Sequence, residues 1–224
     1  MIATANRGLL EQSNLPGIIK AQPWQHTLAR VTHELAQLVD LPAPLAVREG
    51  RAVLAQLTQD REFLTAQIWP ILAEVQSEGP YVARRYEAPG GAYSLQVFVW
   101  PAGAQTQIHD HSCWGIFGPV AGTLREERYL RLDDGARASE AHLRAAWRRV
   151  WTPDDGLSTL LPYAGGVHRV SNRSLHPAIS IHVYGPQGTI DGRDYDPLRD
   201  YVCDRLTDDT PGGLLLDDLI AACR

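Results

Sequence analysis

Apolar residues recur at helical spacing through the first third of the chain. From Trp24 onward they follow one another at steps of three and four residues, at Leu28, Val31, Leu35 and Leu38, which gives a helix one apolar stripe. Pro42 and Pro44 end this pattern, because proline does not suit a helix interior. A second helix is predicted over about 46–58 and a third over about 61–77, kinked or divided at Pro70. Residues 1–22 lack strong periodicity and are predicted to form a loosely attached arm.

After Gly79 and Pro80 the pattern changes from helical to strand-like. Short runs rich in β-branched and aromatic residues alternate with glycine, proline and Asp-Gly turns, which is typical of antiparallel strands. The predicted strands cover 93–100, 115–129 with an interruption near 118–119, 146–151, 167–170 and 178–184. Asp-Asp-Gly sequences at 133–135 and 154–156 predict hairpin turns. An apolar run over 214–222 predicts a short C-terminal helix.

This order of elements predicts a mostly β chain with N-terminal helices. The arm and helices over 1–79 are expected to pack on a β-barrel or jelly roll over 80–224 that includes the C-terminal helix. We expect a single structural unit, because no linker separates the two parts and 224 residues suit one large domain.

Composition narrows the partners and the compartment. The net charge of −5 argues against nucleic acid, whose phosphates require a basic surface. No apolar run approaches the roughly 20 residues of a membrane helix, and no secretory signal is evident. The three cysteines, Cys113, Cys203 and Cys223, are odd in number and widely spaced, which does not fit a disulfide framework. We expect a cytoplasmic protein with no membrane, nucleic-acid or obligatory protein partner.

Histidines in two separate stretches suggest a metal site. In the first stretch, over 103–111, His109 and His111 are two residues apart, so on a strand they point to the same side and Asp110 to the other. Such imidazoles lie about 7 Å apart along the strand and can share a metal ion. His168, in the second stretch over 162–172, supplies a third imidazole from a distant strand. Three ligands leave open coordination positions, which indicates a reactive metal.

The spacing of these residues resembles the paired motifs of the cupin superfamily. The first stretch follows the pattern Gly-x5-His-x-His, with Gly122 further on, and the second contains His168 followed by Asn172 after three residues. The resemblance implies a cupin barrel. Cupins usually carry a glutamate four or five residues after the second histidine, but Gly115 and Ile116 occupy those positions here. The resulting site would be neutral, with three histidines and no carboxylate.

With no glutamate at these positions, the sequence resembles a narrower family, the thiol dioxygenases of the cysteine dioxygenase type. The similarity covers about 80–195 and rests on the ordered set of motifs around 106–115, 168–172 and 180–184. It implies Fe(II) on the histidines His109, His111 and His168. It also implies a relay of Ser180, His182 and Tyr184 beside the iron, and these three share one strand face. The metal itself comes from the resemblance, since three imidazoles also accept zinc, nickel, cobalt or copper.

The family also uses an arginine to hold the substrate carboxylate, because guanidinium offers a matching two-pronged fork. Arg193 lies nine residues after Tyr184, a spacing similar to that in bacterial 3-mercaptopropionate dioxygenases. In animal cysteine dioxygenases the arginine lies instead in the first strand. Ala83 falls at that position here, with Arg84 and Arg85 next to it. We favour Arg193 and keep Arg84 and Arg85 as alternatives.

A second departure concerns the tyrosine of the relay. Animal cysteine dioxygenases crosslink it to a cysteine five residues after the second histidine. The corresponding position here is Ile116 or Gly115, and the nearest cysteine, Cys113, has the wrong spacing. We therefore predict a free phenol on Tyr184, as in the bacterial enzymes.

The resemblance implies an enzyme that adds both atoms of O2 to the sulfur of a small mercapto-carboxylic acid and forms a sulfinate. The substrate favoured is 3-mercaptopropionate, with cysteine next. Two other classes stay open, because one barrel hosts many functions. One is another metal-dependent cupin enzyme, an isomerase or a decarboxylase, which would not need the Ser-His-Tyr strand. The other is a non-catalytic cupin sensor that binds a ligand without consuming oxygen.

Overall fold

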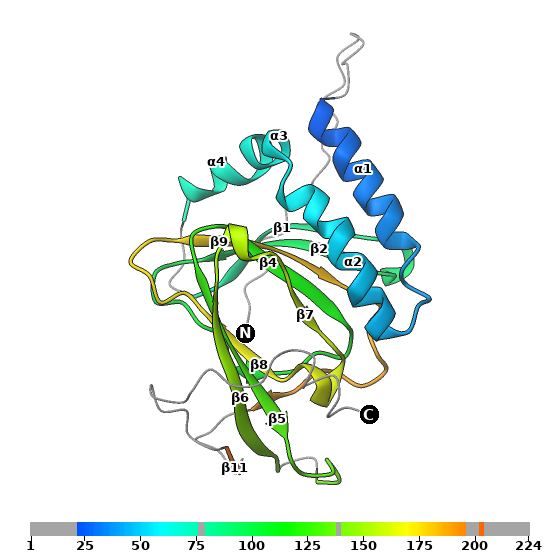
Figure 1. Ribbon diagram of the computed structural model, residues 1–224, viewed down its shortest axis with the longest axis vertical. Helices are drawn as coiled ribbons and strands as arrows, with labels where there is room; N and C mark the ends of the chain where they lie inside the picture. The colour runs from blue at the N-terminus through cyan, green and yellow to red at the C-terminus, as the bar shows by residue number, and fades with distance from the viewer. Residues whose placement is uncertain (1–21, 76–78, 138–139, 196–201, 204–224) are drawn as a thin grey trace.

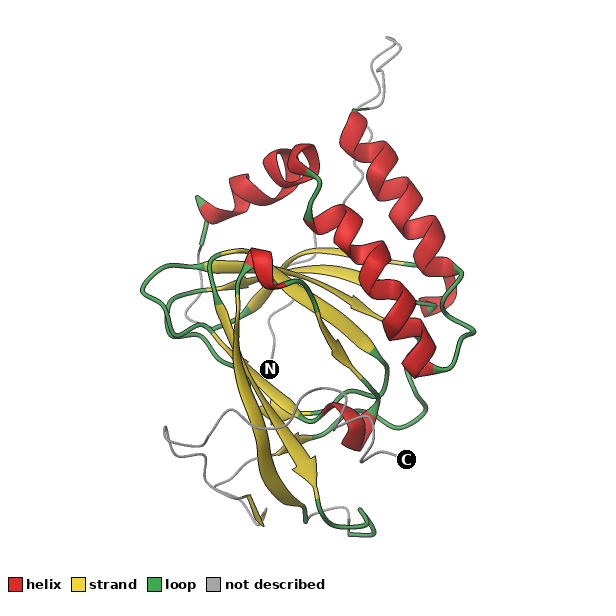
Figure 2. Ribbon diagram, viewed as in Figure 1, coloured by secondary structure: helices red, strands yellow, loops and turns green. Residues whose placement is uncertain are grey.

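The structure, a computed structural model, describes residues 22–75, 79–137 and 140–195 and the backbone of 202–203. Helices lie along one side of a β-barrel built from two sheets (Figures 1 and 2). The predicted architecture, mostly β with N-terminal helices packed on a β-barrel, is confirmed. The predicted arm, apart from its last residue, and the C-terminal helix over 214–222 lie outside the described residues.

The helical region spans residues 23–72. Its segments are α1 (Pro23–Ala36), α2 (Ala43–Thr58), α3 (Arg61–Phe63), a π-helical turn over Leu64–Ile68, and α4 (Trp69–Leu72). The start of α2 at Ala43 precedes the predicted position, because Pro44 fits the first turn, where a missing N–H costs nothing. Over the third predicted helix, the chain widens into the π turn before Pro70, whose nitrogen has no hydrogen to donate to a helical hydrogen bond. Within the described part of the chain, no helix combines the length and apolarity needed to span a membrane.

The strands form two sheets whose neighbours are antiparallel, except that β11 runs parallel to β6. The first sheet, called sheet A, has the order β1 (Tyr81–Glu87), β2 (Ser94–Trp100), β9 (Ala178–Tyr184), β4 (Gly115–Ala121) and β7 (Ser158–Leu160). The second, called sheet B, has the order β10 (Asp194–Tyr195), β3 (Ile108–His109), β8 (His168–Ser171), β5 (Leu124–Arg131), β6 (His142–Trp151) and β11 (Val202–Cys203).

Two strand predictions are wrong in detail. The interruption predicted near 118–119 does not occur: β4 continues through Pro119, and the pairing shifts register just after it, which accommodates the missing donor. The break between β4 and β5 comes instead at Gly122, whose φ of 71° favours glycine. The Asp-Asp-Gly turn at 133–135 joins the paired strands β5 and β6, as predicted, whereas the turn at 154–156 leads from β6 in sheet B to β7 in sheet A.

Alternation along β9 separates the hydrophobic core from the barrel interior. Ile179, Ile181 and Val183 are fully buried against the helices, in one core cluster with residues such as Leu35 and Leu54. The intervening residues therefore point to the other side of the sheet, into the barrel. That inner side holds the polar residues of the candidate site.

Candidate metal centre

Three histidines converge inside the barrel, as the sequence predicts. His109 ends β3 and stands opposite His168 at the start of β8, while His111 lies in the loop that follows β3. The ring centroid of His109 lies 4.7 Å from that of His111 and 4.6 Å from that of His168. One ligand nitrogen from each ring lies within 4.8 Å of the other two, and the Nε2 atoms of His111 and His168 are 3.2 Å apart.

Hydrogen bonds orient two of these rings. The Nδ1 of His109 lies 2.9 Å from the main-chain carbonyl oxygen of Gln107, and the Nδ1 of His168 lies 3.1 Å from Oε1 of Glu126. Each of these Nδ1 atoms therefore carries the hydrogen and donates it, which leaves Nε2 with a free lone pair. Burial lowers the pKa of all three imidazoles, so they stay neutral, the form that binds a metal.

The donor set fits a divalent transition metal. Three neutral imidazoles facing one point suit iron, zinc, cobalt, nickel or copper. The cluster found among the described residues contains histidines only, without a carboxylate. Neither position where cupins usually place a glutamate offers a ligand here: Ile116 packs in the core under the helices, and Gly115, opposite Tyr184, has no side chain. The arrangement can hold a metal and leave positions open for other ligands.

The predicted Ser-His-Tyr relay forms a continuous chain of hydrogen bonds. Ser180 Oγ lies 2.7 Å from Nε2 of His182, and Nδ1 of His182 lies 2.9 Å from the hydroxyl of Tyr184. The chain starts at Trp100, whose indole N–H donates to Ser180 Oγ over 2.7 Å. It ends beside the histidine cluster, where the rings of Tyr184 and His111 are 5.1 Å apart. No sequence motif marks Trp100 for this role.

Burial keeps the Ser-His-Tyr relay uncharged. It lowers the pKa of His182 to about 3 and raises that of Tyr184 above its usual value. Both side chains are therefore neutral at physiological pH, and the phenol keeps its hydrogen. Burial also raises the pKa of the nearby Cys113 thiol to about 11. The relay can therefore donate or accept hydrogen bonds without bringing a charge to the centre.

The position that faces the tyrosine ring is Gly115. It pairs directly with Tyr184 across β4 and β9. A Cβ atom at Gly115 would lie 3.2 Å from Cδ1 and 3.3 Å from Cε1 of Tyr184, so even a small side chain would press on the ring. Of the two positions considered for a crosslinking cysteine, Gly115 is thus the one beside Tyr184.

Asp110 lies between His109 and His111 in the sequence and faces away from them, into a second set of contacts. It is buried and accepts hydrogen bonds from the amide of Arg193 at 2.7 Å and from the hydroxyl of Tyr195 at 2.6 Å. Its own amide donates to the carbonyl of Arg193 at 2.9 Å. These bonds attach β10 to the strand that carries the first histidine.

The three arginines considered for a substrate carboxylate lie in different places. Arg193 is half-buried and has its backbone bonded to Asp110, one residue before β10. Arg85 stands opposite Gln96, in the row that continues to His182, but its side chain is 41% exposed and its guanidinium pairs with Glu87 at 2.9 Å.

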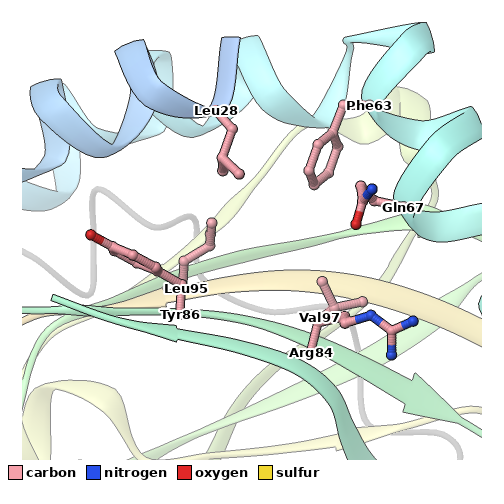
Figure 3. Close-up of a pocket in the computed structure, with 7 residues that line it drawn as sticks. All are labelled: Leu28, Phe63, Gln67, Arg84, Tyr86, Leu95 and Val97. Carbon is pink, nitrogen blue, oxygen red and sulfur yellow. The ribbon is translucent and has the colours of Figure 1, made fainter. Parts of the chain in front are cut away.

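Arg84 lies on the opposite side of sheet A and is not brought together with the histidines. Figure 3 shows it at a pocket between the sheet and the helices, where Leu28 and Phe63 point toward Leu95 and Val97. The space there is about 30 Å³, about what one water needs. Alternation along β1 turns Arg84 outward, so this placement does not support its predicted contact with a substrate bound at the histidines.

Two buried charges that the sequence motifs do not predict lie behind the histidines, Glu126 and Arg128 in the middle of β5. Their side chains are 0% and 5% exposed, and Arg128 Nε donates to Glu126 Oε1 over 2.6 Å. The segment 124–131 reads as a strand, yet it carries charged residues on both of its faces. Charges at interior positions of a central strand are a signal for buried ion pairs, because unpaired charges are not tolerated there.

Comparison with known proteins places this centre in a family. The chain is similar in fold to oxalate decarboxylase from Bacillus subtilis, with 17% identity and a TM-score of 0.37 over 55% of this chain and 30% of that one. It is also similar to a conserved protein with a double-stranded β-helix domain from Klebsiella pneumoniae, with 16% identity and a TM-score of 0.34 over 55% of this chain and 89% of that one. The family model for cysteine dioxygenase type I matches residues 25–195, which include the histidines and the relay. The chain therefore belongs to the cysteine dioxygenase type I family.

Proposed function

We propose that this chain is a non-haem Fe(II) thiol dioxygenase of the cytoplasm that converts a small mercapto-carboxylic acid to its sulfinate. The favoured substrate is 3-mercaptopropionate, and cysteine is the next candidate. Family membership supports thiol oxidation in general. The observation that carries the proposal is the convergence of three neutral imidazoles beside the Tyr184 end of a buried hydrogen-bonded chain.

The proposed reaction joins a thiol and O2 into one product. The S–H proton leaves, the O–O bond breaks, and two S–O bonds form, so sulfur is oxidised and both oxygen atoms are reduced within the same molecule. An iron(II) ion held by His109, His111 and His168 would supply a reduced metal with free positions for thiolate and O2. A neutral ligand set suits an anionic sulfur ligand, because the thiolate then supplies the negative charge next to the metal.

The relay is proposed to hold one hydrogen at the Tyr184 oxygen. The indole of Trp100 occupies one lone pair of Ser180, so the serine hydroxyl can donate to His182 Nε2. His182 then donates from Nδ1 to the Tyr184 oxygen, and the phenol hydrogen is directed toward the substrate. The raised pKa of Tyr184 keeps that hydrogen in place at physiological pH. The substrate and oxygen would thus meet a neutral donor of fixed position.

Arg193 is proposed to bind the substrate carboxylate. Its support is the bonding of its backbone to Asp110, between two of the histidines, and its spacing from Tyr184. Arg193→Ala should raise the KM for 3-mercaptopropionate far more than the KM for cysteamine, which has no carboxylate. Arg85→Ala is the matched comparison, since Arg85 lies on the interior row of sheet A but at its exposed edge. Equal effects of Arg193→Ala on both thiols would remove Arg193 from this role.

The test of the whole proposal is oxygen consumption by anaerobically iron-loaded protein. The protein is offered 3-mercaptopropionate, cysteine, mercaptosuccinate and cysteamine in parallel, and sulfinate is quantified. One O2 consumed for each sulfinate formed is the expected result, with the fastest turnover on 3-mercaptopropionate. Protein that contains iron but consumes no oxygen with any of these thiols would overturn the proposal.

A further inference from the structure

A buried carboxylate lies directly behind one of the three histidines. The side chain of Glu126 is fully buried, and four donors surround it. Oε1 is contacted by Arg128 Nε at 2.6 Å and by His168 Nδ1 at 3.1 Å. Oε2 accepts from Ser158 Oγ at 2.7 Å and from Trp151 Nε1 at 3.0 Å. A carboxylate held by this many donors has a fixed position and orientation.

The strand order explains how this carboxylate comes to lie there. β5 lies between β6 and β8 in sheet B. In this pairing Arg128 stands opposite His168, and Glu126 stands two residues away on the same side of the sheet. Arg128 compensates the charge of Glu126, and its Nη2 also donates to Ser158 Oγ at 3.1 Å and to the carbonyl of Thr159. Arg128, Ser158 and Trp151 therefore satisfy most of the hydrogen-bonding capacity of the Glu126 carboxylate, and the remaining contact of Oε1 is to His168.

This contact decides what His168 can do. Because Nδ1 faces an anionic acceptor, the ring hydrogen stays on Nδ1 and the lone pair stays on Nε2, toward His111. The equivalent nitrogen of His109, Nδ1, donates instead to the main-chain carbonyl of Gln107. A carboxylate acceptor makes an imidazole a stronger donor to a metal than a carbonyl does, and it also fixes the ring plane.

We propose that Glu126 is the positioning residue of the metal centre. It holds His168 in the tautomer and orientation that present Nε2 to the ion. Glu126 does not contact substrate, and Arg128 keeps the pair neutral, so its influence passes through the imidazole. The inference rests on the proposed function only for the identity of the metal as iron, since the geometry applies to any divalent ion at these histidines.

The chain contains a matched control for this role in the next residue. Glu127 is 2% exposed, almost as buried as Glu126, and it lies on the opposite side of β5. It pairs with Arg125, Arg148 and Arg169 and contacts no histidine among the described interactions. A general effect of losing a buried glutamate from β5 would appear in both positions. An effect on metal affinity that acts through His168 would appear only when Glu126 is substituted.

The experiment measures Co(II) affinity by competition with a chelator, together with the visible spectrum of the bound ion. Glu126→Gln is expected to weaken Co(II) binding by about 10- to 100-fold and to change the spectrum. Glu127→Gln is expected to leave the affinity within about twofold of the wild type. Wild-type affinity in Glu126→Gln, or an equal loss in both variants, would overturn the proposal.

A second variant decides the matter where Glu126→Gln does not fold. The double substitution Glu126→Gln, Arg128→Met removes both charges and leaves no unpaired arginine in the interior. It is expected to bind Co(II) as weakly as the single variant would, whereas wild-type affinity would overturn the proposal. The readout is independent of thiol oxidation. Wild-type protein that binds Co(II) in this Glu126-dependent way but, loaded with iron, oxidises no thiol would contradict the proposed function and leave the role of Glu126 intact.

Discussion

The two sheets line the same interior with different chemistry. Sheet B contributes His168 with an ionised partner, Glu126, behind it. Sheet A contributes His182, whose ring nitrogens meet only hydroxyl groups, those of Ser180 and Tyr184. Both histidines are buried and stay neutral. Phe117 lies between them, with its ring centroid 5.8 Å from His168 and 4.9 Å from His182.

The difference shows that the partners of an imidazole, and not its burial, decide its role. His168 has one nitrogen bound to a carboxylate and one lone pair free, which makes it a suitable metal ligand. His182 has both nitrogens occupied, so it can pass hydrogen bonds along a chain but cannot also bind a metal. Each of the following predictions changes one side of this pair and compares it with the other.

The largest expected effect is on metal binding. His168→Ala removes one of three ligands, so Co(II) affinity should fall by on the order of 100-fold or more, beyond the loss expected for a residue behind a ligand. His182→Ala should keep Co(II) affinity within a few-fold of the wild type. Chelator competition measures both. Equal losses in the two variants would mean that the two histidines do not differ in role.

The second effect is on stability. Arg128→Met leaves the Glu126 carboxylate buried without its cation, which should lower the free energy of unfolding by about 3–5 kcal/mol. Ser180→Ala in sheet A removes a neutral partner from Trp100 and His182, and should cost about 1–3 kcal/mol. Urea unfolding of the metal-free proteins at neutral pH compares them. A smaller loss for Arg128→Met than for Ser180→Ala would contradict the contrast between a charged and a neutral inner face.

The third effect is on turnover. Tyr184→Phe removes the terminal hydroxyl of the relay, and the kcat for thiol oxidation should fall by about 10- to 100-fold. Co(II) affinity should not change. Tyr93→Phe is the control, because the Tyr93 hydroxyl is bonded to the carbonyl of Thr32 on the helix side of sheet A. A Tyr184→Phe variant with the kcat of the wild type would show that the relay does not take part in the reaction.

The last effect is on the pH dependence of stability. The pKa of His182 is about 3 in the folded chain, against 6.5 as the usual value. Between these values the unfolded chain binds a proton that the folded chain does not, so stability falls as the pH is lowered, by up to about 1.4 kcal/mol per pH unit. His182→Gln lacks this dependence. The stability advantage of metal-free wild type over His182→Gln should therefore shrink from about pH 7 to about pH 4. A constant difference in urea unfolding would contradict it.

Periodicity and spacing predicted most of the frame of this site. Alternation along 178–184 places Ser180, His182 and Tyr184 on one side, and the structure agrees. The spacing of His109 and His111 brings their rings together, although only His109 lies within a strand. These features are local, because they depend on residues close together in the chain.

The partners of those residues could not be predicted in the same way. Trp100 reaches Ser180 across 80 positions of sequence, and Glu126 reaches His168 across 42. Such contacts depend on strand order and register, which a single sequence does not specify. A charged residue in a strand is also first interpreted as exposed, since buried charges are rare. Glu126 was missed for that reason, and the break predicted near Pro119 was wrong because a register shift accommodates the proline.

The bonds between Asp110 and Arg193 have a consequence for the opening motions of the native state. Each residue uses its own amide to bind the other, so the segment between the first two histidines and the segment before β10 cannot detach separately. In native-state hydrogen exchange such segments behave as one cooperative unit. The amides of Asp110 and Arg193 should therefore exchange through the same opening event, with equal free energies of opening, and bound metal should slow both together.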